Sequence, residues 1–340
     1  MMATKGTALP PGLIVRTGKF VWRTMWHTMM SQMAPRNQSG DYVRPQSAFR
    51  GREIEAAPQR YWLIVGMSCP WAHRTLITRV LKGLQATVGV ITVYPSTDEG
   101  RWLFDAAQPH LPVGFPTAEC RSLPEFYRHC HSGYAGRATV PVLWDSLSQT
   151  IVNNESADII ELLNSEFEAY ATGLDLYPKS LRSTIDQLND DIYNSVNNGV
   201  YRCGFAQTQA AYEKAAGELF ATLDELDARL AGQRYLCGQA LTLADVRLFT
   251  TLIRFDVAYY GLFKCDRTRI ADYPHLSGYL RDLYQLPGIA DTCDIDAVKR
   301  DYYGNLFPLN PGGIIPLGPG WDGLQKPHDR DKSGFNDSLG

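Results

Sequence analysis

The sequence contains no uninterrupted apolar run that approaches the ~18 residues of a membrane-spanning helix. It also has little net charge, −3 over 340 residues, so the overall charge gives no attraction to nucleic acid or to a membrane. The apolar fraction of 44% and the charged fraction of 20% are typical of a globular protein with one large domain or two ordinary ones. Neither a membrane nor a nucleic acid is therefore an expected partner.

Closely spaced cysteine pairs are also absent. The seven cysteines are widely spaced, with no C-x-x-C pair, which argues against a disulfide framework and for a reducing, cytoplasmic location. His129-Cys130-His131, with Cys120 ten residues earlier, has metal-ligating residue types without the usual zinc spacing. We therefore predict no metal site and interpret this segment as a loop.

Acidic residues are missing from the first 40 positions, which contain five basic residues. This bias resembles an organellar transit peptide and leaves organellar targeting open. Trp22, Trp26 and the absence of a clear cleavage region favour instead an N-terminal arm, residues 1–56, that packs on the body of the protein. A short helix is expected near residues 17–30 of this arm.

The most informative stretch follows the arm. The apolar run Tyr61–Val65 predicts a buried strand, and apolar residues then recur at helical spacing up to Lys82-Gly83. Cys69 therefore lies where a strand turns into a helix, and Pro70 occupies the first helical position. Free N–H groups and the helix dipole stabilise a thiolate at such a position, and the thiolate is the reactive form. The sequence thus predicts a reactive thiol at Cys69 rather than a buried core cysteine.

The remaining pattern divides into two parts. Residues 95–138 show little periodicity and are interpreted as a long loop insertion. On either side of it, further strands are expected at 87–94, 139–145 and 149–152, with a helix at 156–163. The first of these strands completes a βαβ unit with parallel strands. Pro141 has no N–H to donate, so it belongs at a strand start or a bend, and its peptide bond can be cis.

From about residue 177 the pattern is helical only. Helices are predicted at 181–195, 207–230, 242–259, 273–284 and 294–303. A change from alternating strands and helices to helices alone predicts a domain boundary, here near 166–178. We expect an α/β domain over 57–168, an all-helical domain over 177–305, an ordered extension over 306–321 and a disordered tail over 322–340.

Together these features resemble a glutathione transferase, with a thioredoxin-like first domain and an all-helical second domain. The stretch Ser68-Cys69-Pro70-Trp71-Ala72-His73-Arg74 is similar to the signature of the glutathionyl-hydroquinone reductases, the Xi class of that family. Further pieces agree in the same order, namely Gly100–Phe104, Arg137–Asp145, Ile151–Ser156, Asn197–Tyr201 and Ile315–Pro319.

The resemblance implies a catalytic thiol at Cys69, glutathione as co-substrate, glutathionylated quinols as substrates, a homodimer and no metal. It implies that glutathione is held by Trp102, Val140, Pro141, Glu155 and Ser156, with Pro141 in the cis form. Either Arg128 or Arg137 is expected to bind the glycyl carboxylate. The quinol is expected to contact Tyr193, Tyr302 and Tyr303. The family pattern has a histidine where this chain has Asp301, so the quinol pocket is expected to differ there.

Several of these residues also have ordinary structural explanations. Glu155 and Ser156 can serve only to cap a helix, and Trp102 can be core filler. His73 lies one helical turn after Cys69 and is either a proton donor or a structural histidine. The sequence leaves these alternatives open.

The number of nearby thiols limits the chemistry. No second cysteine lies within three residues of Cys69, so an external thiol has to resolve its oxidised form. In such a monothiol cycle Cys69 attacks the sulfur of a glutathionyl-hydroquinone, and a second glutathione then releases oxidised glutathione. Two alternatives remain. One is an Omega-type thiol transferase or dehydroascorbate reductase that uses Cys69; the other is a non-enzymatic carrier of aromatic glutathione conjugates, which needs no reactive thiol.

Overall fold

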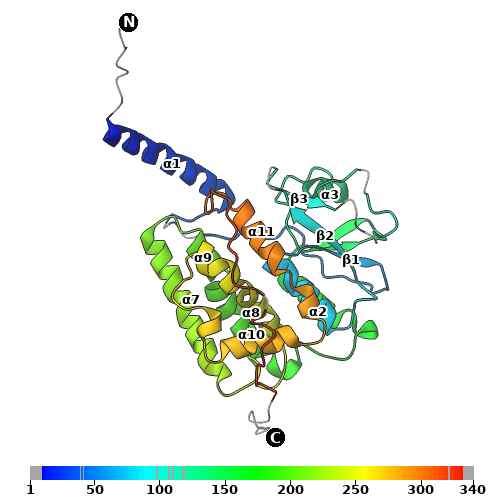
Figure 1. The fold of residues 1–340 in the computed structure, drawn as a ribbon. Coiled ribbons are helices and arrows are strands. Elements are labelled where there is room, and N and C mark those ends of the chain that lie inside the picture. The colour runs from blue at the N-terminus through cyan, green and yellow to red at the C-terminus, as the bar shows by residue number, and fades with distance from the viewer. Residues whose placement is uncertain are drawn as a thin grey trace.

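The computed structural model describes residues 10–38, 40, 42–96, 99–105, 108, 111–116, 119–320 and 322–331. It shows a sheet domain beside a helical domain, with helix α1 (Pro11–Met33) projecting from the body (Figure 1). The predicted fold class, a thioredoxin-like domain followed by an all-helical domain, is confirmed.

The sheet domain is built around strand β1 (Tyr61–Gly66), all of whose residues are buried. The sheet has the order β3-β2-β1-β4-β5. The other strands are β2 (Gly89–Pro95), β3 (Trp102–Phe104), β4 (Val142–Asp145) and β5 (Thr150–Asn153). β1 and β2 pair in parallel, as predicted for a βαβ unit, whereas β4 runs antiparallel to β1. Helix α2 (Pro70–Leu81), which connects β1 to β2, packs against helix α4 (Ser156–Ser165).

The interpretation of residues 95–138 as a loop is wrong for two parts of that segment. Strand β3 extends the sheet, and helix α3 (Leu123–Cys130) covers it, with a capping box formed by Ser122 and Glu125. The helix has only eight residues, too few for periodicity to be evident in the sequence. His129 and Cys130 thus end a helix, and no cluster of three metal-ligating side chains occurs in the described part of the chain.

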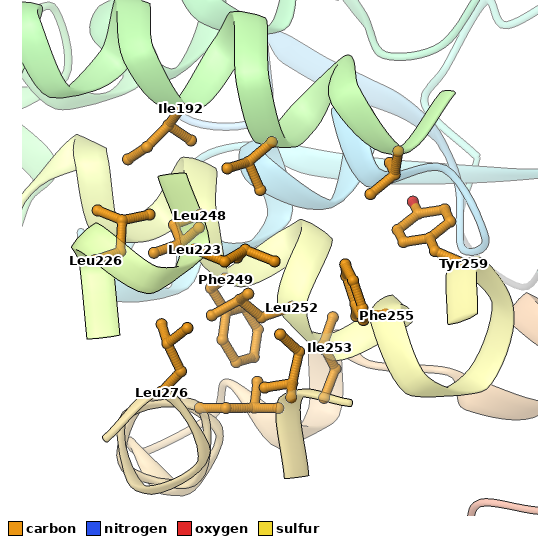
Figure 2. Close-up of a cluster of buried hydrophobic side chains, with 14 of the residues drawn as sticks. Ile192, Leu223, Leu226, Leu248, Phe249, Leu252, Ile253, Phe255, Tyr259 and Leu276 are labelled. Carbon is orange, nitrogen blue, oxygen red and sulfur yellow. The ribbon is translucent and has the colours of Figure 1, made fainter. Parts of the chain in front are cut away.

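The helical domain is centred on helix α8 (Leu243–Arg254), every residue of which is buried. Figure 2 shows Leu248, Phe249 and Leu252 of this helix pointing into the core formed with its neighbours. The surrounding helices are α5 (Arg182–Asp191), α6 (Gly199–Gly204), α7 (Gln209–Leu230), α9 (Tyr260–Leu262), α10 (Leu276–Gln285) and α11 (Ile295–Asn305). Wider π-helical turns, Ile192–Asn197 and Phe255–Tyr259, continue α5 and α8, which explains why each was predicted as one longer helix.

Asp245 of α8 is a fully buried carboxylate that fixes the start of this helix. It accepts hydrogen bonds from the Leu236 and Thr242 amides, the Thr242 hydroxyl and the Tyr279 hydroxyl, at 2.8–2.9 Å. Asp245→Ala leaves these donors buried without an acceptor, so we expect it to lower the free energy of unfolding by about 3 kcal/mol. Urea unfolding measures this loss. The control Asp272→Ala removes an exposed ion pair with Arg269 and should leave the midpoint almost unchanged.

Both ends of the described chain differ from expectation. Helix α1 begins at Pro11 and ends at Met33, longer than the predicted 17–30, and only its C-terminal part packs on the body. The tail predicted to be disordered contains the buried Arg330, which donates hydrogen bonds to the carbonyls of Leu230, Gln233 and Arg234. Residues 322–331 are therefore held against the helical domain, and residues 332–340 lie outside the described residues. Within the described chain, no helix has both the length and the apolar character required to span a membrane.

Candidate active site

Cys69 lies at the start of α2, as the sequence predicts. It is the N-cap residue, and its side chain makes no capping hydrogen bond within this helix. Its Sγ lies 3.7 Å from the carbonyl oxygen of Val140, and the Val140–Pro141 peptide bond is cis. The thiol opens into a cleft of about 310 Å³ between the two domains. Apart from Cys69, the cleft is lined by Tyr42, Ser68, Pro70, Pro95, Trp102, Arg137, Tyr201, Phe205, Asp301, Tyr302, Asn305 and Leu306.

Trp102 of β3 reaches this cleft across β2, because β1 ends in a glycine where the indole lies. A methyl group at Gly66, the last residue of β1, would overlap the six-membered ring of Trp102. The indole therefore packs directly on the backbone that leads to Cys69. Its half-buried ring is partly available to a ligand, which a core tryptophan is not.

The two arginines that the sequence offers for the glycyl carboxylate, Arg137 and Arg128, lie in different places. Arg137 lines the cleft that contains Cys69. Arg128 lies on α3, is exposed and does not line this cleft. The structure thus brings Arg137, and not Arg128, near the thiol.

Glu155 and Ser156 form the start of α4. The Glu155 carboxylate accepts hydrogen bonds from the Ala157 amide at 3.2 Å and from the Ser47 hydroxyl at 2.8 Å. The capping role is therefore present, and it leaves acceptor capacity on the carboxylate. Ser156 is buried, and its hydroxyl accepts a hydrogen bond from Arg74 at 3.3 Å.

Arg74 is a fully buried guanidinium beside this helix start. It also donates to the side-chain oxygen of Asn197 at 2.6 Å, and its Nε has no hydrogen-bond partner within the described chain. Burial, together with the nearby Arg247 and Arg44, lowers the pKa of Arg74 well below its usual value. A buried cation beside a helix N-terminus favours a carboxylate ligand at this place.

Of the three tyrosines predicted to contact the substrate, only Tyr302 lines the cleft. The ring of Tyr193 lies 6.0 Å from that of Trp71, outside the cleft lining. Tyr303 faces α9, with its hydroxyl close to Gly261. The structure therefore does not bring Tyr193 and Tyr303 to the thiol.

Tyr201 of α6 was missed as a site residue and forms a hydroxyl cluster beside the thiol. Its hydroxyl lies 2.6 Å from that of Tyr302, which in turn lies 3.0 Å from that of Tyr259. Burial is the main reason that the pKa of each of the three phenols is raised, so all three are protonated at neutral pH. Tyr201 ends the stretch Asn197–Tyr201 that resembles the family, which was the available signal. Its pairing with Tyr302 joins residues 101 positions apart.

His73 does not face the cleft. Its Nε2 lies 2.9 Å from the Thr292 hydroxyl and its Nδ1 lies 2.9 Å from Arg254 Nη1. Burial and the Arg254 charge lower the pKa of His73 well below its usual value, so the ring is neutral. The structure thus favours the structural alternative for this histidine.

Arg254, at the end of α8, contacts both His73 and the turn that precedes Cys69. Its guanidinium donates to the carbonyls of Met67 and Ser68, at 3.1 and 2.9 Å. These are the two residues before Cys69, so one buried side chain of the helical domain fixes the backbone that carries the thiol. Nothing in the sequence indicates this role for an arginine 185 residues beyond Cys69.

Comparisons with known proteins agree with this geometry. The model of the glutathione S-transferase N-terminal domain matches residues 68–166, and that of the C-terminal domain matches residues 209–282. The chain belongs to the glutathione transferase family. Within that family it is similar to the Xi class and to enzymes named glutathionyl-hydroquinone reductases.

Three relatives illustrate this similarity. Glutathionyl-hydroquinone reductase YqjG of Escherichia coli is 44% identical over 92% of this chain and 97% of its own length. Its glutathione-bound structure has a TM-score of 0.77 at 47% identity, over 82% of this chain and 90% of that one. Glutathionyl-hydroquinone reductase PcpF of Sphingobium chlorophenolicum is 43% identical over 88% of this chain and 94% of its own. The structure of the Xi glutathione transferase of Phanerochaete chrysosporium has a TM-score of 0.78 at 42% identity, over 83% of this chain and 94% of that one.

Proposed function

We propose that the protein is a glutathionyl-hydroquinone reductase that uses Cys69 as its nucleophile. The observation that carries this proposal is the placement of one thiol, at a helix N-terminus, in a cleft whose other wall bears protonated tyrosines. The relatives named for this activity support it, since they are 43–44% identical over most of the chain.

The reaction proceeds in two steps, a cleavage of the carbon–sulfur bond followed by a thiol–disulfide exchange. The Cys69 thiolate bonds to the sulfur of the glutathionyl adduct while the bond from this sulfur to the quinol ring carbon breaks. The electron pair stays with the ring carbon, which takes up one proton and becomes the C–H group of the released hydroquinone. A second glutathione thiolate then attacks the mixed disulfide, which yields oxidised glutathione and regenerates the Cys69 thiolate.

Glutathione binding is assigned to residues of the cleft and of the start of α4, which packs against α2. The backbone of Val140, before the cis Pro141, faces Cys69 and supports a role in pairing with the cysteinyl part of glutathione. Glu155 and Ser156, with the buried Arg74 beside them, suit the charged γ-glutamyl end. Trp102 and Arg137 lie on the cleft lining, where Arg137 suits the glycyl carboxylate.

The two arginines provide a matched test of this assignment. Arg137→Met should raise the KM for glutathione about tenfold or more, because a charged hydrogen bond to the carboxylate is lost. Arg128→Met should leave KM within about twofold, because Arg128 is exposed on α3 and does not line the cleft. Steady-state kinetics at varied glutathione measures both. A larger effect from Arg128→Met would contradict the assignment.

A substrate panel separates the proposed reaction from its alternatives. We expect kcat/KM for a glutathionyl-hydroquinone to exceed that for dehydroascorbate or a small disulfide by about 10²-fold or more, because only the aromatic substrate uses the tyrosine-lined wall. The reverse order would identify an Omega-type thiol transferase. Binding without turnover, with a Cys69 alkylation rate that depends on pH as in free cysteine, would identify a carrier.

The assembly of the protein is proposed from the resemblance, and its location from the spacing of its cysteines. We expect a homodimer in a reducing, cytoplasmic compartment. Light scattering of the purified protein measures its oligomeric state. Microscopy of the tagged full-length chain in cells shows its compartment.

A further inference from the structure

The N-terminal half of α1 is an exposed apolar helix. The exposed fractions of its large apolar side chains range from 45% for Trp22 to 73% for Phe20. The full set is Leu13, Ile14, Val15, Phe20, Val21, Trp22 and Met25. A side-chain carbon added at Gly12 or Gly18 would meet no atom within 4 Å. No other segment of the described chain therefore covers this half of the helix, which projects from the body in Figure 1.

The other end of α1 is firmly held. Met30 is fully buried in the helical core, and Trp26 Nε1 donates to the carbonyl of Pro308 at 3.1 Å. At a rise of about 1.5 Å per residue, residues 11–25 extend about 22 Å beyond this anchor. The protein thus presents a helix of several turns at a fixed point on its surface.

The charges on α1 are all of one sign. Arg16, Lys19 and Arg23 are exposed, and residues 1–40 contain no aspartate or glutamate. At 100° per residue these three cations fall within a sector of roughly 60°. Five of the apolar side chains, Ile14, Val15, Val21, Trp22 and Met25, fall within a separate arc of roughly 120°. Leu13 and Phe20 lie outside this arc, on the far side of the cations. The helix is therefore amphipathic, with one broad apolar face beside the positive charges and a smaller apolar patch beyond them.

We propose that α1 binds to the surface of a membrane containing anionic phospholipid, lying in the interface with its apolar face among the acyl chains. An exposed helix with Trp and other apolar side chains on one face and Lys or Arg beside them has the features of an interfacial helix. Each basic side chain near an anionic surface strengthens binding about fivefold, so three of them favour anionic over neutral lipid about a hundredfold.

This proposal revises the expectation that a membrane is not a partner. That expectation rested on the absence of a spanning segment and on a net charge near zero. A helix in the membrane plane needs only one apolar face. The net charge also hides an asymmetry, because residues 41–340 contain 28 basic and 36 acidic residues while residues 1–40 contain five basic residues alone.

Lipid suits α1 better than a second α1 from another copy of this chain. Two such helices packed through their apolar faces would place six cations on one helix pair, with no acidic side chain on either helix to compensate. Anionic headgroups supply that compensation along the whole helix.

Co-sedimentation of the full-length protein with vesicles tests the proposal. We expect binding to vesicles of phosphatidylcholine with phosphatidylglycerol to be about a hundredfold stronger than to vesicles of phosphatidylcholine alone, and to weaken as salt rises. The double variants Val21→Ser/Trp22→Ser and Arg16→Glu/Arg23→Glu should each bind at least tenfold more weakly. Both should keep the turnover of the unaltered protein, which shows that the body is folded.

Two surface changes away from α1 serve as matched controls. Leu147→Ser removes a 74% exposed apolar side chain of the sheet domain, and Lys214→Glu reverses an exposed charge on α7. Both should bind vesicles as the unaltered protein does. The proposal is overturned if the unaltered protein binds neither vesicle, if the α1 variants bind equally well, or if α1 instead mediates a dimer that these variants dissociate without lipid.

Discussion

Cys69→Ser is expected to lower the turnover of glutathionyl-hydroquinones by about 10⁴-fold or more. A serine hydroxyl at the same helix start stays protonated at neutral pH and is a far weaker nucleophile toward sulfur than a thiolate. The cleft and the residues proposed to bind glutathione are unchanged in this variant, so glutathione should still bind. Single-turnover kinetics measures the loss, and calorimetry with glutathione shows that the site is intact.

The other cysteines provide the control for this result. Burial raises the pKa of Cys120 to about 11, of Cys130 to about 12 and of Cys293 to about 11, so these thiols remain protonated at neutral pH. Cys130→Ser should therefore keep near-full activity. Iodoacetamide should label Cys69 first in the unaltered protein, as peptide mapping would show. Activity retained by Cys69→Ser, or lost in Cys130→Ser, would refute the assigned nucleophile.

Much of the fold could be predicted because its signals are local. The run Tyr61–Val65, the proline after Cys69 and the periodicity of the long helices each act over one element, and the structure has β1, α2 and the helical domain where they were expected. The spacing Thr242-x-x-Asp245 is a local pattern of the same kind, and in the structure these two residues form a capping box at the start of α8. The short elements β3 and α3 were not predicted, because three and eight residues are too few to show a periodicity of apolar side chains.

Residues of the candidate site could be predicted only where the signal lies in neighbouring residues of the sequence or in a stretch that resembles a family. Cys69 combines both kinds of signal. The choice between Arg137 and Arg128 depends on which side of a folded segment faces the thiol, and sequence spacing does not encode that. Arg254 acts on the Cys69 turn from another domain, through two backbone carbonyls, so its contribution appears only in three dimensions.

Tyr302→Phe is expected to lower kcat for glutathionyl-hydroquinones by about 10²-fold or more, with little change in the KM for glutathione. When Cys69 takes the sulfur, the ring carbon needs a proton, and a positioned donor contributes a factor of this size. Tyr302 lines the cleft with its hydroxyl 2.6 Å from that of Tyr201 and 3.0 Å from that of Tyr259. These hydroxyls orient one another and allow a transferred proton to be replaced along the cluster.

The neighbouring Tyr303→Phe is the matched control, because the same atom is removed one residue along α11. Tyr303 faces α9 rather than the cleft, so kcat should remain within about twofold of the unaltered enzyme. The rate of Cys69 alkylation should be the same in both variants, which separates loss of the proton donor from damage to the thiol. Equal activity of Tyr302→Phe and Tyr303→Phe would remove the tyrosine cluster from the mechanism and leave solvent as the proton source.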